Sequence, residues 1–261
     1  IGSGGRDVFV AAAGGAGVRL LVETLESSED DAQSCACCVA LLNACHQHLP
    51  SREALLDCGG VQALVTALAS ENIEVKTAAA GALLNCAATA GCAEAIREAA
   101  VDSRGGSASG FELLARCFHA AHPPLLRARA AGALFNCAAF GPDTRVGLLE
   151  AGVVKAVAGA LVAAFATEET TPTPPSRAAN HAKHPSAAAV AAAEETTLRI
   201  QANLIGCALN LALNPTCKAE LLRNGAMPPL VVALRSSNEA VQAQASTAIA
   251  YLSDKAEPRP G

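Results

Sequence analysis

The chain has 261 residues and a formal net charge of −5, with no run of Lys or Arg. This disfavours nucleic acid as the main partner, because neutralising phosphates requires a basic stripe. Hydrophobic residues make up 51% of the chain and aromatic residues only 3%, and much of the apolar content is Ala, which suits closely packed helices. The longest apolar run, 153–166, is too short to cross a bilayer and contains Lys155, so no membrane span is predicted.

One segment recurs along the chain and defines a repeat. Its copies are CCVALLNAC at 37–45, AAAGALLNCAA at 78–88, AAGALFNCAA at 130–139, LIGCALNLA at 204–212 and QASTAIAYLS at 244–253. Four copies carry an asparagine (Asn43, Asn85, Asn136 and Asn210), and Tyr251 stands where a fifth would fall. The intervals of 42, 51, 74 and 41 residues indicate a period near 42 with two insertions, which is typical of helical solenoids.

Each unit is predicted to contain a short helix, a glycine bend, a medium helix, a polar turn and a long helix. Ser51 is expected to cap the helix that follows it, the segment SSEDD the helix from 32, and Asn214-Pro215 the first helix of the last unit. The predicted helices are 18–25, 32–46, 52–57, 61–69, 74–88, 93–101, 111–121, 123–140, 143–150, 153–166, 195–213, 218–223, 228–234 and 239–252.

These helices divide the chain into one repeat domain with two tails. The repeats span about 18–46, 50–89, 91–140, 142–213 and 214–253; residues 1–17 are a cap or the remnant of a preceding repeat, and residues 254–261 are a tail. Because the sequence starts without Met or a signal-peptide pattern, we expect a piece of a longer chain.

Two insertions interrupt the period. Residues 102–110, DSRGGSASG, are predicted to form a flexible loop. Residues 167–194 begin with a segment rich in Pro and Thr, which we expect to be mobile and non-helical, and 187–193 can add a turn or two of helix before the long helix from 195.

The repeat resembles the armadillo repeat. The match is fullest in the last unit, NPTCKAELLRNGAMPPLVVALRSSNEAVQAQASTAIAYLS, and nearly as good in LLDCGGVQALVTAL followed by AAAGALLNCAA. The resemblance implies an all-α, right-handed α-solenoid of about five armadillo repeats of three helices each, whose third helices line a concave groove. It further implies that the groove binds an extended segment of a partner protein, with the asparagines of the third helices bonded to its backbone. On this chain those positions are Asn43, Asn85, Asn136 and Asn210, and the series stops at Tyr251.

The residues support the same hypothesis independently. A side-chain amide both donates and accepts, so a row of amides at one-repeat spacing can pair with the N–H and C=O groups of an extended peptide. Two turns before the asparagines stand Ala36, Ala78, Arg129, Asn203 and Gln244. We therefore expect Arg129, Asn203 and Gln244 to give the C-terminal half of the groove its side-chain specificity.

The asparagines have an alternative, structural role. Each asparagine can instead brace the loop after its own helix without contacting a ligand.

One turn before the asparagines, where importin-α-type members carry Trp, this chain has Val39, Gly81, Gly132, Gly206 and Thr247. The sequence therefore disfavours a nuclear-import receptor for basic signals.

No catalytic signature, cofactor motif or metal site is predicted. Cys35, Cys37, Cys38, Cys45, His46 and His48 crowd one span, but on a helix Cys35 and Cys37 point about 200° apart, so these residues are not expected to bind one metal ion. Most of the eleven cysteines fall within helical patterns as small core residues, so we expect a reducing, cytoplasmic location, with nucleus and cilium as alternatives.

The sequence therefore leads to two hypotheses of function. The first is a non-enzymatic scaffold that holds an extended or helical segment of a partner protein. The alternative is a structural segment of a larger assembly, packed through its convex or end surfaces. The oligomeric state is left open.

Overall fold

Stacked helical layers account for almost all of the computed structural model, which describes residues 15–103, 106–166 and 186–254. The N-terminal half contains α2 (Ala16–Ser27), α3 (Asp31–Cys45), α4 (Leu49–Asp57), α5 (Gly60–Leu68), α6 (Ile73–Cys86), α7 (Ala90–Glu98), β1 (Ala100–Ser103), β2 (Gly106–Ser109) and α8 (Gly110–Arg116). The C-terminal half contains α9 (Pro124–Ala139), α10 (Pro142–Glu150), α11 (Val153–Ala164), α12 (Ala187–Leu211), α13 (Pro215–Arg223), α14 (Met227–Ala233) and α15 (Glu239–Ser253).

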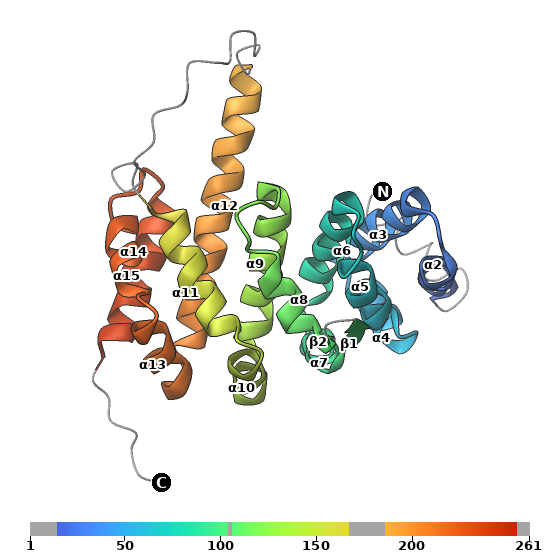
Figure 1. Cartoon of the computed structure of the whole chain (residues 1–261), viewed down its shortest axis with the longest axis horizontal. Coiled ribbons are helices and arrows are strands. Elements are labelled where there is room, and N and C mark those ends of the chain that lie inside the picture. The colour runs from blue at the N-terminus through green and yellow to red at the C-terminus, as the bar shows by residue number, and fades with distance from the viewer. Residues whose placement is uncertain (1–14, 104–105, 167–185, 255–261) are drawn as a thin grey trace.

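The helices form three rows along the molecule (Figure 1). Each helix contacts the helix one repeat away from it. The first row is α4, α7, α10 and α13; the second is α2, α5, α8, α11 and α14; the third is α3, α6, α9, α12 and α15. The chain is therefore an all-α solenoid, in which each unit buries its apolar face against its neighbours.

Local signals explain where the helices begin and turn. Asn72 accepts hydrogen bonds from the main-chain N–H groups of Glu74 and Val75 at 2.8 and 3.2 Å, and Asn214 caps α13 in the same way. Between the first and second helices, Gly59 has φ 73°, a left-handed conformation that costs other residues about 1–2 kcal/mol. Gly152 and Gly225 repeat this bend with φ 70° and 76°.

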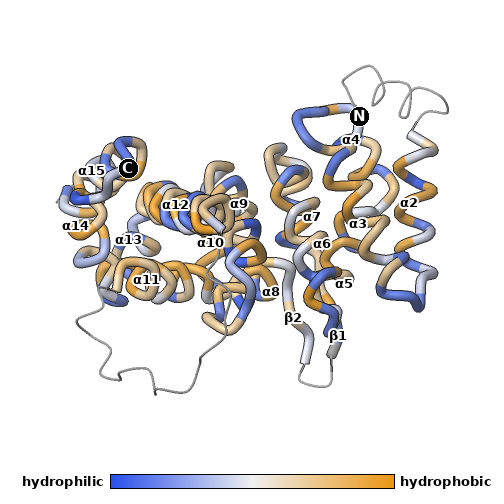
Figure 2. The backbone as a smooth tube through the Cα atoms, turned by 90° about the horizontal axis from the view of Figure 1, so that it is seen from above, coloured by the Kyte–Doolittle hydropathy of each residue, from blue (hydrophilic) through white to orange (hydrophobic). Residues whose placement is uncertain are grey.

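A continuous core runs the length of the array. Fully buried leucines such as Leu41, Leu64, Leu134 and Leu161 alternate with buried alanines, and burying each large side chain contributes about 1.5–3 kcal/mol. The apolar positions recur on the helix faces that meet one another (Figure 2). The abundance of Ala allows the third helices to approach closely.

The first insertion differs from the expectation of a flexible loop over 102–110. Strands β1 and β2 pair antiparallel, from Ala100 opposite Ser109 to Ser103 opposite Gly106. The pairing of the two strands orders the described residues of this segment, and Gly106, with φ 111°, has a conformation that favours glycine. The hairpin contacts α5 and α8 beside the body of the solenoid (Figure 2).

Other differences are local. Ser51 is not a cap: the His48 ring accepts from the Ser51 N–H at 3.2 Å, and α4 already begins at Leu49. Ala187–Leu211 is one continuous helix, so the last residues of the 167–194 insertion belong to the long helix, and this Ala-rich end extends beyond its neighbours (Figure 1). The expected mobile Pro/Thr-rich segment and the expected N-terminal cap fall largely outside the described residues.

Within the described ranges, no single helix is long and apolar enough to cross a membrane. Helices α10 and α11 reach that length and apolarity only when they are taken together, and a bend of 76° separates them.

Candidate functional site

The predicted asparagines connect neighbouring third helices. The Nδ2 atom of Asn85 donates to the Leu42 carbonyl at 2.8 Å, and that of Asn136 donates to the Leu84 carbonyl at 3.0 Å. Asn210 repeats the contact with the Phe135 carbonyl at 3.3 Å. Each acceptor immediately precedes the asparagine of the previous repeat, so the amides form a ladder from helix to helix. The sequence suggested that each asparagine could brace the loop after its own helix. The observed partner is instead the preceding third helix.

Asn43 differs from the other three. It lies on α3, the first third helix that the structure describes, and its side chain is exposed. In the described part of the chain its amide makes no hydrogen bond, because there is no preceding third helix there to supply a carbonyl. Asn43 is therefore the natural control for the bracing role.

A second ladder lies two turns away. The Nδ2 atom of Asn203 donates to the Ala128 carbonyl at 3.1 Å, and the Nη1 atom of Arg129 donates to the Thr77 carbonyl at 2.7 Å. The structure thus places two of the three predicted specificity residues at the junctions between α6, α9 and α12. The third, Gln244, has a buried Oε1 atom without a hydrogen-bond partner among the described residues.

Glycines set the close approach of the third helices. A Cβ atom on Gly81 would lie 2.4 Å from Cδ1 of Leu42, one on Gly132 would lie 2.7 Å from Cδ1 of Leu84, and one on Gly206 would lie 2.8 Å from Cε2 of Phe135. The side chain that precedes each asparagine therefore packs over the glycine of the next helix. This explains in physical terms why an aromatic side chain does not fit at these glycine positions.

The electrostatics of this face centre on Arg129. Burial and the neighbouring Arg199 lower the pKa of the Arg129 guanidinium, with a smaller opposing effect from the Cys35 thiol. Arg199 itself pairs with Glu195 at 2.8 Å on the exposed part of α12. No carboxylate within the described ranges forms an ion pair with Arg129, so this part of the face is locally positive.

We use the name third-helix face for the surface that carries these two ladders; Asn43 is exposed there, and the ladder asparagines are half-buried. Four cavities of the described structure have volumes of about 220 to 430 Å³. None of them is lined by Asn43, Asn85, Asn136 or Asn210.

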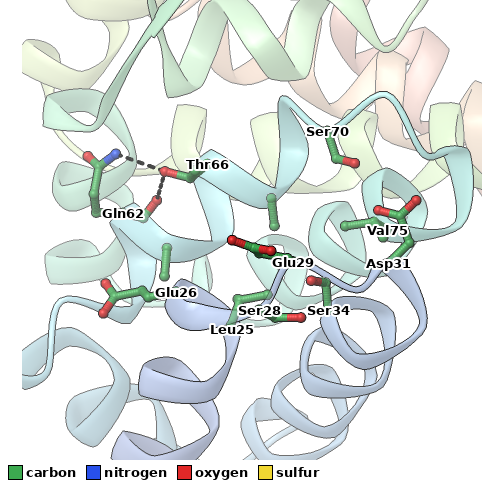
Figure 3. Close-up of a pocket in the computed structure, with 12 residues that line it drawn as sticks. Leu25, Glu26, Ser28, Glu29, Asp31, Ser34, Gln62, Thr66, Ser70 and Val75 are labelled. Carbon is green, nitrogen blue, oxygen red and sulfur yellow. Dashed lines mark hydrogen bonds between the residues drawn. The ribbon is translucent and has the colours of Figure 1, made fainter.

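A different cavity, which the sequence did not predict, lies between the α2–α3 turn and α5 (Figure 3). It has a volume of about 320 Å³ and is lined partly by the carboxylates of Glu26, Glu29 and Asp31. Asp31 already accepts a hydrogen bond from Asn72 at 2.9 Å. The cavity contains none of the residues of the two ladders.

The cysteines lie mainly in the core. Burial raises the pKa of the Cys38, Cys45 and Cys207 thiols to about 12. His48 of the cysteine- and histidine-rich span is the N-cap of α4. Among the described residues, no group of three or more His, Cys, Asp or Glu side chains is arranged to hold a metal ion.

Comparisons with known proteins identify the repeat. The model of the armadillo/β-catenin-like repeat matches residues 50–88 and 214–254. No curated protein matches the sequence significantly.

Solved structures extend the likeness over the whole fold. An engineered protein solved by a structural genomics consortium superposes with a TM-score of 0.72 at 23% identity, over 95% of this chain and 83% of its own. A designed armadillo repeat protein in complex with the peptide (KR)4 has a TM-score of 0.72 at 19% identity, over 96% of this chain and 87% of its own. Two repeats of the chain thus match the armadillo repeat model, and the three-row solenoid as a whole has the fold of these solved structures, one of them a designed armadillo repeat protein.

Proposed function

We propose that this chain is a non-catalytic scaffold that binds an extended segment of a partner protein across the third-helix face. The observation that carries the proposal is the amide ladder of Asn85, Asn136 and Asn210. One N–H of each amide is used by the preceding helix, which fixes the orientation of the group. The Oδ1 atom and the second N–H make no hydrogen bond within the described chain and are available to a ligand.

The spacing of the ladder favours a strand-like ligand. Packed helices lie about 8–10 Å apart, and an extended peptide rises about 3.3 Å per residue. One amide therefore meets the ligand about every third residue, and pairs with its main chain. The peptide complex of the designed armadillo neighbour supports this class of ligand, and the tolerance for side chains follows from backbone pairing.

The test measures peptide binding by fluorescence anisotropy with an acetylated and amidated (AQ)4 peptide. The double variant Asn85→Ala/Asn136→Ala should weaken binding at least fivefold. Because these amides also brace the helices, the matched control is Asn238→Ala, which removes the N-cap of α15, where Asn238 accepts from the Val241 N–H at 3.1 Å, and leaves all ladder amides in place. A cap is worth about 1 kcal/mol, so the control loses stability without touching the face. Equal affinity in the double variant and the wild type would refute the proposal.

A second function is favoured by the surface of the last repeat. Val231 and Leu234 are 48% and 41% exposed, whereas Val65 and Leu68 at the same positions of the second repeat are 0% and 2% exposed. In the second repeat the following repeat covers this surface. The apolar surface of α14 suits packing against another folded unit, whether a further repeat, a second copy of the chain or a partner in a larger assembly.

Light scattering coupled to size exclusion separates this second function from the first. Val231→Ser combined with Leu234→Gln should shift an associated species to the monomer mass while leaving (AQ)4 binding unchanged. A monomer already in the wild type, at concentrations up to about 100 μM, would reject self-assembly through this surface.

We also propose a cytoplasmic location for the protein. All eleven cysteines are free thiols and most are buried as core residues, which suits a reducing, cytoplasmic environment, with nucleus and cilium as alternatives.

A further inference from the structure

One charged side chain interrupts an otherwise neutral row on the third-helix face. Two turns before the asparagine or Tyr251 position, the third helices carry Ala36, Ala78, Arg129, Asn203 and Gln244. Arg129 is the charged member of this row and lies on α9, in the middle of the solenoid (Figure 1). A ligand that crosses the face meets its charge at one fixed point.

The contacts of Arg129 hold its guanidinium in a defined place. Nη1 donates to the Thr77 carbonyl of α6 at 2.7 Å. The Cζ and Nε atoms lie over Gly81, where a Cβ would approach each of them to 3.0 Å. The absence of a side chain at Gly81 therefore makes the space that the guanidinium occupies. Nε and Nη2 make no hydrogen bond within the described residues, so donors of the planar group are left for another acceptor.

Among the described residues, no carboxylate forms an ion pair with Arg129. The side chain is half-buried, and the charged neighbour that acts on it is Arg199 of α12, which has the same sign. Glu195, the nearest acid on that helix in sequence, is engaged by Arg199 itself. A partly desolvated cation whose bond to the protein is to a neutral carbonyl gains from an incoming carboxylate, because the pair adds Coulombic attraction and can form two parallel hydrogen bonds.

We propose that Arg129 binds a carboxylate side chain, Asp or Glu, of the extended partner segment. This inference rests on the proposed peptide-binding function and adds the chemistry of one ligand position to it. The complex of the designed armadillo neighbour contains a peptide of alternating Lys and Arg. The specificity inferred here has the opposite sign.

Three acetylated and amidated peptides test the inference: (AE)4, (AQ)4 and (KR)4. Alternation places the same side-chain type on one side of an extended chain in every register, and the blocked termini leave Glu side chains as the source of carboxylates. In 50 mM NaCl the wild type should bind (AE)4 about tenfold tighter than (AQ)4, and (KR)4 more weakly than both. The preference should shrink in 300 mM NaCl as the charges are screened.

Variants assign the preference to one residue. Arg129→Met should bring the affinity for (AE)4 down to that of the same variant for (AQ)4, so that the ratio of the two affinities falls from about ten to about one. Arg129→Lys keeps the charge without the planar fork and should retain a two- to fourfold preference, which preserves the test if the Met variant folds poorly. Arg235→Met, which removes an exposed arginine after α14, is the matched charge control and should leave the preference unchanged.

The outcomes separate this inference from the proposed function. Binding of (AQ)4 without a preference for (AE)4, or a preference that survives Arg129→Met, overturns the role of Arg129 and leaves peptide binding standing. Binding of none of the three peptides overturns both.

Discussion

The side-chain amide of Asn136 donates a hydrogen bond of 3.0 Å to the main-chain carbonyl of Leu84, one repeat earlier in the chain. Leu84 in turn packs its side chain against Gly132, one turn before Asn136 on the same helix. The polar contact and the apolar contact therefore join the same two helices at one junction. The same arrangement recurs between Asn85 and Leu42.

Removing a bracing amide should lower the free energy of unfolding. Asn85→Ala and Asn136→Ala each remove a part-buried hydrogen bond and leave a carbonyl with one partner fewer, so each should cost about 1 kcal/mol. Urea denaturation followed by circular dichroism measures the change. Asn43→Ala is the control and should change stability by less than about 0.5 kcal/mol, because Asn43 is exposed and makes no such bond in the described structure. Equal losses at all three positions would contradict the bracing role.

Two glycines should respond to alanine with opposite signs. At the exposed Gly159 of α11 a Cβ would meet no atom within 4 Å, so Gly159→Ala should stabilise the protein by about 1 kcal/mol through helix propensity. At Gly110 a Cβ would lie 2.4 Å from the Ile96 carbonyl oxygen, which is main chain and cannot move aside cheaply. Gly110→Ala should therefore destabilise by about 2 kcal/mol or more. Thermal melts of both variants test the difference, and a shift of the same sign in both would refute it.

Much of the fold follows from local signals in the sequence. Glycines such as Gly59 are needed where the backbone is left-handed, and Asn72 or Asn214-Pro215 mark helix starts by supplying an acceptor at the N-cap. These signals depend on a few adjacent residues. Each of the fourteen described helices overlaps a predicted one, although α12 begins eight residues earlier than predicted and α8 ends five residues earlier.

The ladders of the third-helix face were harder to predict, because their acceptors are main-chain carbonyls. The Leu42, Leu84 and Phe135 carbonyls carry no residue-type signal, and their neighbours on the next helix are distant in sequence. A usable signal was the glycine one turn before Asn85, Asn136 and Asn210, which indicates close helix approach. The β1–β2 hairpin was missed because Gly and Ser favour loops locally and the pairing supplies the order.

The bend between the first and second helices should tolerate asparagine better than alanine. Gly152 has φ 70° and no atom within 4 Å of the Cβ position, so the cost of a side chain there is a backbone cost alone. Gly152→Ala should destabilise by about 1–2 kcal/mol, and Gly152→Asn by less, because Asn visits the left-handed region more readily. Urea denaturation of the pair decides the point: an alanine variant as stable as the asparagine variant would contradict it.

Alkaline pH should destabilise the protein through its buried thiols. Burial, assisted by the neighbouring Cys217, raises the pKa of Cys207 to about 12 from an ordinary value near 9. A thiol whose folded pKa is raised contributes its full stability below pH 9 and loses it as the pH rises toward 12, because the unfolded chain then releases a proton that the folded chain retains. Each such thiol should lower the free energy of unfolding by about 1.4 kcal/mol per pH unit in this window. In urea titrations at pH 7.5, 9.5 and 10.5, Cys207→Ala should show a shallower decline than the wild type, whereas Val231→Ala, without an ionisable group, should follow the wild type. A decline in Cys207→Ala as steep as that in the wild type would assign the alkaline sensitivity to other groups.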